Sequence, residues 1–140
     1  MNIMKIKKVL ALAEELDAIE DGNSCYLYNQ NYTLTEVAPE SREPGEPRLM
    51  CGCVAGLAYM LFRPNGHALA EQMVVKNEFI ENVLVHAAVL LGLNESQANE
   101  LFASDPDFSP RASEAARALR HLALMPERNP WKDAVKGDQQ

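Results

Sequence analysis

The sequence of 140 residues lacks the features that define several protein classes. It has three cysteines, an odd number that does not suit a framework of paired disulfides. No apolar stretch reaches the roughly 20 residues of a membrane-spanning helix. The basic first residues are not followed by a signal-type apolar segment. We therefore expect a cytoplasmic protein without a membrane partner.

Basic clusters and glycine-rich loops are missing as well. The net charge is -7, and acids outnumber Lys and Arg nine to five in residues 1–50 and five to two in 51–104, but equal them at six each in 105–140. Phosphate binding needs clustered Lys and Arg, so this distribution argues against a nucleic-acid partner. An acidic surface serves solubility, or docking on a basic partner, or DNA mimicry. Without a phosphate cradle, we expect no cofactor.

Residues 49–62 organise the rest of the chain. They carry no charge, and a helix that is apolar on every side must be surrounded by other elements. We therefore predict a buried central helix at about residues 53–62. Gly52 and Gly56, four residues apart, would let a neighbouring backbone approach this helix closely.

Apolar periodicity and capping signals predict four more helices. They cover residues 3–20, 78–91 with Asn77 as the N-cap, about 95–102 after a capping box of Asn94 and Gln97, and 109–124 starting at Ser109-Pro110. The first of these has lysines at its start and acids at its end, against the helix dipole, so it should depend on packing.

Two further segments stay open at this point. Residues 67–76 fit a short helix followed by an extended piece. Residues 24–38 hold three of the four tyrosines and several β-branched residues, and fit either a small hairpin that pairs 26–28 with 32–34 or an irregular segment.

Taken together, these elements predict an all-α, or mainly α, fold. It would be an irregular bundle of about five helices around the central one, in a single domain over 1–140. The segment 39–48, rich in proline, would be a mobile loop. The tail 136–140 would be frayed, after a Trp131 that folds back on the core.

Cysteine chemistry is the sharpest catalytic hypothesis. Cys51 and Cys53 lie at the start of the predicted central helix, where the dipole and free N–H groups lower a thiol pKa, so a cysteine-dependent hydrolase is one interpretation. None of His67, His86 and His121 takes the strand position that a general base needs in such folds. Cysteines used as small apolar core residues explain the same pattern.

A zinc site would need three or four convergent ligands. Cys51, Cys53, Cys25 and one histidine could supply them, but no second pair occurs at ligand spacing. We therefore predict no metal site.

The helix predicted at 78–91 has a second aliphatic strip. Val85 and Val89 lie one turn apart, opposite its main apolar face, beside Asn82 and His86. The strip is either covered by another element, for which the 3–20 helix is the nearest candidate, or forms an interface. A two-fold homodimer would be the simplest such interface.

A small basic face is expected on the 109–124 helix. Arg117, Arg120 and His121 face outward there, together with Glu114. They allow a weak nucleic-acid binder, although Glu114 and the acidic first half argue against it.

The order of features from Cys51 onward resembles a group of small uncharacterised phage and bacterial proteins. The resemblance covers a little over half of the chain and implies a helical fold and a mobile-element origin, but no activity. The features that carry it are Cys51-Gly52, Cys53-Val54-Ala55-Gly56, Leu91-Gly92-Leu93, Gln97-Ala98, Leu101-Phe102, Ser109-Pro110 with 115–119, and Trp131.

Our functional prediction is a non-enzymatic interaction protein, as a phage or mobile-element accessory that binds a host protein. The cysteine-dependent hydrolase and the nucleic-acid binder are the alternatives.

Overall fold

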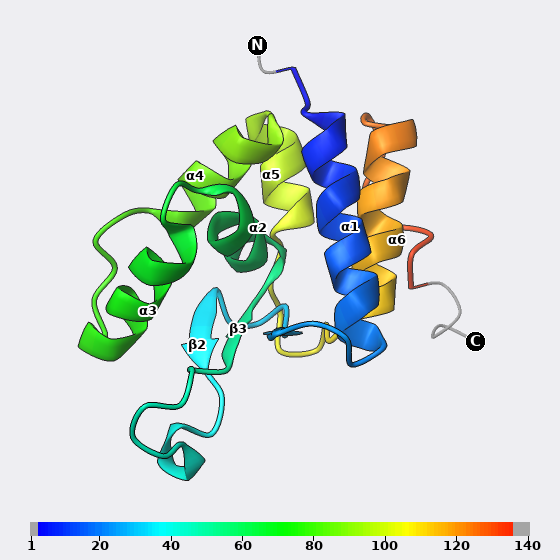
Figure 1. Cartoon of the computed structure of the whole chain (residues 1–140). Coiled ribbons are helices and arrows are strands. Elements are labelled where there is room, and N and C mark those ends of the chain that lie inside the picture. Colours follow the sequence, from blue (N-terminus) through cyan, green and yellow to red (C-terminus); the bar gives the residue numbers. More distant parts are fainter. Residues whose placement is uncertain (1–2, 136–140) are drawn as a thin grey trace.

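The computed structural model describes residues 3–135, which form six α-helices and a small three-stranded sheet (Figure 1). The helices are α1 Ile6–Glu20, α2 Val54–Phe62, α3 Gly66–Lys76, α4 Val83–Leu91, α5 Glu95–Leu101 and α6 Ala112–Leu124. The strands are β1 Tyr26–Tyr28, β2 Leu34–Glu36 and β3 Met50–Gly52, with a 3-10 turn η1 at Pro39–Ser41. The prediction of a mainly helical chain is confirmed.

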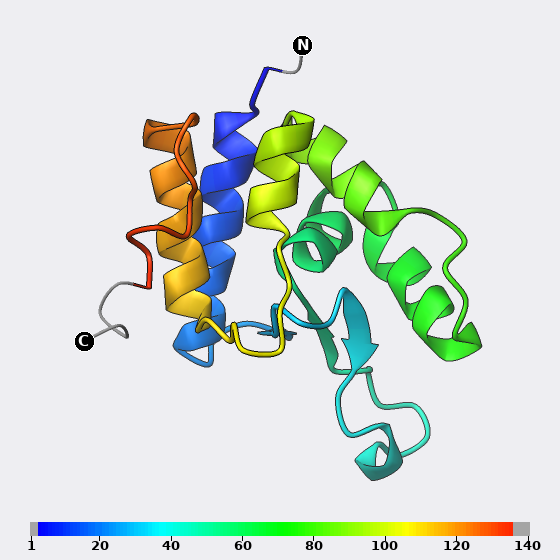
Figure 2. The ribbon, with the colours of Figure 1, turned by 180° about the vertical axis from the view of Figure 1, so that it is seen from behind.

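The predicted central helix is α2, and it is buried as expected. Every residue from Val54 to Met60 is buried, and α2 packs against α3, α4 and the end of β3. Both views place α2 between the α1–α6 pair and the α3–α4 side (Figures 1 and 2). A helix without a polar face fits here because it is covered on all sides.

A close backbone contact fixes the position of α2. A Cβ atom added to Gly56 would lie 1.8 Å from the carbonyl oxygen of Thr33, and one added to Gly52 would lie 2.9 Å from the same atom. The Cys53 N–H donates to the carbonyl of Tyr32 at 2.7 Å. The neighbouring backbone that the two glycines predict is therefore the loop before β2.

The hairpin that was one of the two alternatives for residues 24–38 does not form. Strands form at 26–28 and 34–36, but β3 lies between them in the order β1-β3-β2. β1 runs parallel to β3, with Tyr26 opposite Met50, and β2 runs antiparallel to it, with Leu34 opposite Gly52. The apolar β3 is buried along its whole length, which suits the centre of a sheet rather than an edge.

Gln30 explains why β1 and β2 do not meet. Its side chain is buried and its Nε2 donates to the carbonyls of Leu101 at 3.1 Å and Ala103 at 2.8 Å. Its Oε1 accepts the Tyr28 hydroxyl at 2.8 Å. The loop is thus drawn into the core instead of closing a tight turn, and the strands on either side are left apart.

Helices α1 and α6 lie side by side in both views (Figures 1 and 2). The side of α6 that faces inward is rich in alanine, which allows the two backbones to approach. Two of the acids at the end of α1 have partners on α6: Asp17 pairs with Arg120 at 2.6 Å, and Glu20 accepts the Ser113 N–H at 3.0 Å. That hydrogen bond lowers the pKa of Glu20. Contacts with α6 therefore compensate part of the unfavourable charge order of α1.

The start of α4 differs from the prediction. Asn77 does not cap it, but ends α3 in a left-handed conformation with φ 50°. The ambiguous segment before it is thus wholly helical. Asn82 is the N-cap of α4, and its Oδ1 accepts the Val85 N–H at 3.2 Å. Residues 78–82 form a linker, so two apolar residues that were assigned to a helix, Phe79 and Ile80, are not helical.

The start of α6 is also later than predicted. Ser109-Pro110 does not begin it, because the carboxylate of Glu114 accepts the Arg111 N–H at 2.7 Å and the helix starts at Ala112. Glu114 is buried, with 2% of its surface exposed, so its prediction as an outward-facing residue is wrong.

The remaining predictions for local structure vary in outcome. α5 has the predicted cap, because the Asn94 Oδ1 accepts a hydrogen bond from the Gln97 N–H at 2.8 Å. Trp131 is buried and its Nε1–H donates to the Leu101 carbonyl at 3.2 Å.

In the segment 39–48, two arginines pair with Glu36, and the mobility of this loop stays a prediction. The tail 136–140 lies outside the described residues. Within 3–135, no helix is long and apolar enough to cross a membrane.

We predict that Gly56→Ala destabilises the protein by about 3 kcal/mol or more, because the new methyl group would overlap the Thr33 carbonyl and the packed core cannot shift freely. In an ordinary helix the same change stabilises by up to about 1 kcal/mol. Urea unfolding followed by circular dichroism measures the difference. An unchanged or higher free energy of unfolding would contradict the close contact.

Candidate interaction surface

Exposed apolar side chains gather on and just before α4. Among residues 3–135, fourteen large apolar side chains are exposed, and five of them fall between positions 79 and 89. These five are Phe79 at 58% exposed, Ile80 at 46%, Leu84 at 42%, Val85 at 56% and Val89 at 60%. Contiguous exposure of this kind is typical of a binding site rather than of scattered surface residues.

The second aliphatic strip predicted on this helix, Val85 and Val89, is exposed in the structure. The side of α4 that packs on the core consists of Val83, Ala87 and Leu91. Val85 and Val89 lie away from it and are more than half exposed, so no element of the described chain covers them. α1, the predicted cover, packs mainly on α6 and makes only a small contact with α4. The covered alternative is therefore wrong for the described chain, and the interface stays a prediction.

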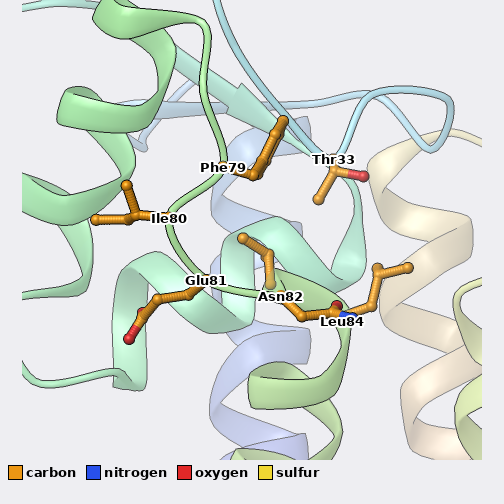
Figure 3. Close-up of a pocket in the computed structure, with 7 residues that line it drawn as sticks. Thr33, Phe79, Ile80, Glu81, Asn82 and Leu84 are labelled. Atoms are coloured by element: carbon orange, nitrogen blue, oxygen red, sulfur yellow. The ribbon is translucent and has the colours of Figure 1, made fainter.

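A first hollow of about 500 Å³ lies beside the linker that precedes α4. It is lined by Thr33 and by residues 79–84. Phe79, Thr33 and Leu84 point to one side of the linker, whereas Ile80 and Glu81 point to the other (Figure 3). Phe79 therefore stands at the edge of this hollow with most of its ring free to contact a partner.

A second hollow of about 380 Å³ lies between α4 and α5, and we call it the α4–α5 groove. It is lined by Leu84, Val85, Ala88, Val89, Leu93, Asn94, Glu95, Ala98, Asn99 and Phe102. Leu84 belongs to both hollows, so they adjoin each other. Together they form one apolar surface that runs from Phe79 along α4 to Phe102.

A polar cluster behind this surface holds the linker in place. Both guanidinium nitrogens Nε and Nη2 of Arg63 contact the carboxylate of Glu81, at 3.3 and 2.8 Å, and the Tyr59 hydroxyl donates to the same carboxylate. The hydrogen bonds from Arg63, followed by that from Tyr59, lower the pKa of Glu81 to about 2. Burial, followed by the bond to Glu81, raises the pKa of Tyr59 to about 12. Glu81 is therefore a fixed anion that joins the linker to α2, rather than a proton donor or acceptor near neutral pH.

The four predicted interaction residues divide between these features. Val85 and Val89 line the groove. Asn82 caps α4 and lines the first hollow. His86 turns to the other side, where its ring meets Tyr59 edge-on at 6.0 Å and its Nε2 lies 3.7 Å from Glu81.

Sequence reasoning missed Phe79, Phe102 and the Glu81 cluster as parts of the site. The predicted helix 78–91 includes Phe79, whereas the structure has this residue in the linker before α4, where it is 58% exposed. The Glu81 cluster joins the end of α2 to a segment 18 positions later, and no local spacing signals such a contact. The apolar character of the segment was visible in the sequence, whereas its exposure was not.

The two arginines of the predicted basic face make contacts within the chain, and both stay partly exposed. The Nη1 of Arg117 donates to the Ala134 carbonyl at 2.6 Å, and Arg120 pairs with Asp17. The two guanidinium groups thus hold the C-terminal segment and α1, and His121 lies next to them at the end of α6. This arrangement supports a structural role for both arginines.

Cys51 and Cys53 have the opposite electrostatics to those of a nucleophile. Cys51 is buried in β3, where burial and then the neighbouring Cys53 raise its pKa to about 11. Cys53 is the N-cap of α2, and burial raises its pKa more than the nearby N–H groups lower it. His67, a candidate base, shares a hydrogen bond with the Tyr26 hydroxyl at 2.9 Å. In the part of the chain that the structure describes, no group of three or more His, Cys, Asp or Glu side chains is arranged to hold a metal ion.

We predict that alkylation by iodoacetamide at pH 8 modifies the exposed Cys25 first, and modifies Cys51 and Cys53 more slowly than in the unfolded chain. A raised pKa leaves less thiolate at this pH, and burial restricts access. Peptide mass spectrometry over time measures the three rates. Faster modification of Cys51 or Cys53 than in the unfolded chain would favour the hydrolase instead.

Comparisons with protein-family models, curated proteins and solved structures give no match to this chain. The resemblance to phage and bacterial proteins therefore stays a prediction.

Proposed function

We propose that this chain is a non-enzymatic protein-binding module whose docking surface is the exposed apolar side of α4, which carries Leu84, Val85 and Val89. The observation that carries the proposal is the continuous row of exposed apolar residues shared by the two hollows, from Phe79 through Leu84 to Val89. Burial of such a row against a partner is favourable at about 25 cal/mol per Å² of apolar surface.

The surface is also held in its shape before any partner arrives. α4 is fastened to α2 through its buried side, and the linker that carries Phe79 is held by Glu81 on Arg63 and Tyr59. A partner then needs to order little of this chain on binding, which leaves more of the contact energy for affinity. The aromatic ring of Phe79 and the pair Val85 and Val89 are the expected anchors.

Neither alternative function has comparable support. A cysteine-dependent hydrolase needs a thiolate near neutral pH, whereas burial raises the pKa of both Cys51 and Cys53. A nucleic-acid binder needs free guanidinium groups, whereas Arg117 and Arg120 bind groups of their own chain.

We predict that Val85→Glu abolishes capture of a partner protein without unfolding the chain. The side chain is 56% exposed, so a carboxylate there stays hydrated in the free protein but would be desolvated in the complex. The tagged full chain and its variant are each incubated with bacterial lysate, and the bound proteins are quantified by mass spectrometry.

Val75→Glu is the matched control, because Val75 is 58% exposed on α3 and lines neither hollow. Circular dichroism should give all three proteins the same fold. We expect a protein that binds the wild type and Val75→Glu but not Val85→Glu. Equal capture by all three proteins would remove α4 as the docking surface.

A further inference from the structure

The Asp and Glu residues around the α4–α5 groove are not balanced by Lys or Arg of the same segment. Between Asn77 and Pro110, the segment that forms both of its walls, there are six acidic residues and no Lys or Arg. Glu95 is the charged residue among those that line the groove, whereas Glu81 in the adjoining hollow is paired with Arg63. The apolar surface is therefore bordered by negative charge.

The groove offers a partner little backbone hydrogen bonding. Its walls are two helices, whose N–H and C=O groups are mostly used within each helix, and the cap of α5 is closed by Asn94 and Gln97. An extended segment buried here would leave its own backbone groups without partners, at a large loss of free energy. An α-helix satisfies these groups internally, so it suits the groove better.

The spacing of the apolar side chains fits a helix as well. Val85 and Val89 are one turn apart on one wall, and Ala98 and Phe102 are one turn apart on the other. The small side chains of Ala88 and Ala98 allow a close approach. α4 has nine residues and is about 13 Å long, so it can hold two to three turns of a partner helix.

We propose that the occupant of the α4–α5 groove is one amphipathic α-helix of a partner protein, with an apolar stripe flanked by Lys and Arg. This inference rests on the protein-binding function proposed above and adds the chemistry of the partner. The apolar stripe would fill the groove in the helix-in-groove mode of recognition. The basic flanks would lie against Glu95 and the other acids of the segment, which steers association and selects the partner.

A second copy of this chain fits the groove less well. A two-fold dimer through α4 would bring two segments together that each carry six acids and no Lys or Arg. Like charges facing each other across an interface disfavour it. An anionic membrane surface would be repelled for the same reason.

The test is selection from a displayed library of helix-forming peptides of about 14 residues, roughly four turns, with equal numbers of acidic and basic members. The full chain is the bait. We expect selected peptides to carry apolar residues at i, i+3 or i+4, and i+7, with Lys and Arg beside them, and to bind more weakly as salt is raised.

Variants then locate the binding site. For a selected peptide, fluorescence anisotropy should show about tenfold weaker binding to Val89→Glu or more, and unchanged binding to Val75→Glu. Glu95→Gln, which keeps the shape of the side chain, should weaken binding severalfold and reduce its salt dependence.

Several outcomes would overturn this inference. They are the absence of selected peptides, selection of acidic or extended peptides, binding that Val89→Glu leaves intact, and sedimentation of the free chain as a dimer that Val89→Glu dissociates. If any of these occurs while Val85→Glu still abolishes capture of the lysate protein, the proposed function stands and only the chemistry of the partner is wrong. If Val85→Glu captures the lysate protein as well as the wild type does, both proposals fail.

Discussion

The fold depends on the contact between the Thr33 carbonyl and the backbone of α2 at Gly56. The position has no room for a Cβ atom, so the loop before β2 can lie directly on the helix only because residue 56 is glycine. This contact, with the bond from the Cys53 N–H to Tyr32, holds the loop against both the sheet and α2. Gln30, from the same loop, then reaches the carbonyls at the end of α5.

The contact also relates the core to the candidate surface. Thr33 lines the first hollow, so the residue that fixes α2 is also part of the wall beside Phe79. From α2, Tyr59 and the following Arg63 hold Glu81 and with it the linker before α4. The candidate surface on α4 is thus held by contacts with α2 and with the linker, which would favour recognition without large rearrangement.

The sequence predicted the elements whose signals are local. The charge-free stretch predicted α2, and the Asn94–Gln97 capping box predicted α5. Val85 and Val89, one turn apart, predicted a second apolar strip on α4. Elements that depend on distant contacts were not predictable in the same way. β3 lies between β1 and β2, and the loop that joins β1 to β2 is held by Gln30, whose partners are 71 and 73 positions away. The start of α4 was misplaced because Asn77 and Asn82 are both good caps, and only the packing of the chain decides between them.

In the free protein, the side of α4 that carries Val85 and Val89 is uncovered. Methyl NMR with a soluble paramagnetic agent tests this most directly, because relaxation of a methyl group increases with its exposure. We expect strong relaxation of the Val85 and Val89 methyl groups, and weak relaxation of those of Val83 and Leu91, which are 3% and 0% exposed. If Val85 and Val89 prove as protected as Val83 in the free chain, the surface is already covered and the account is contradicted.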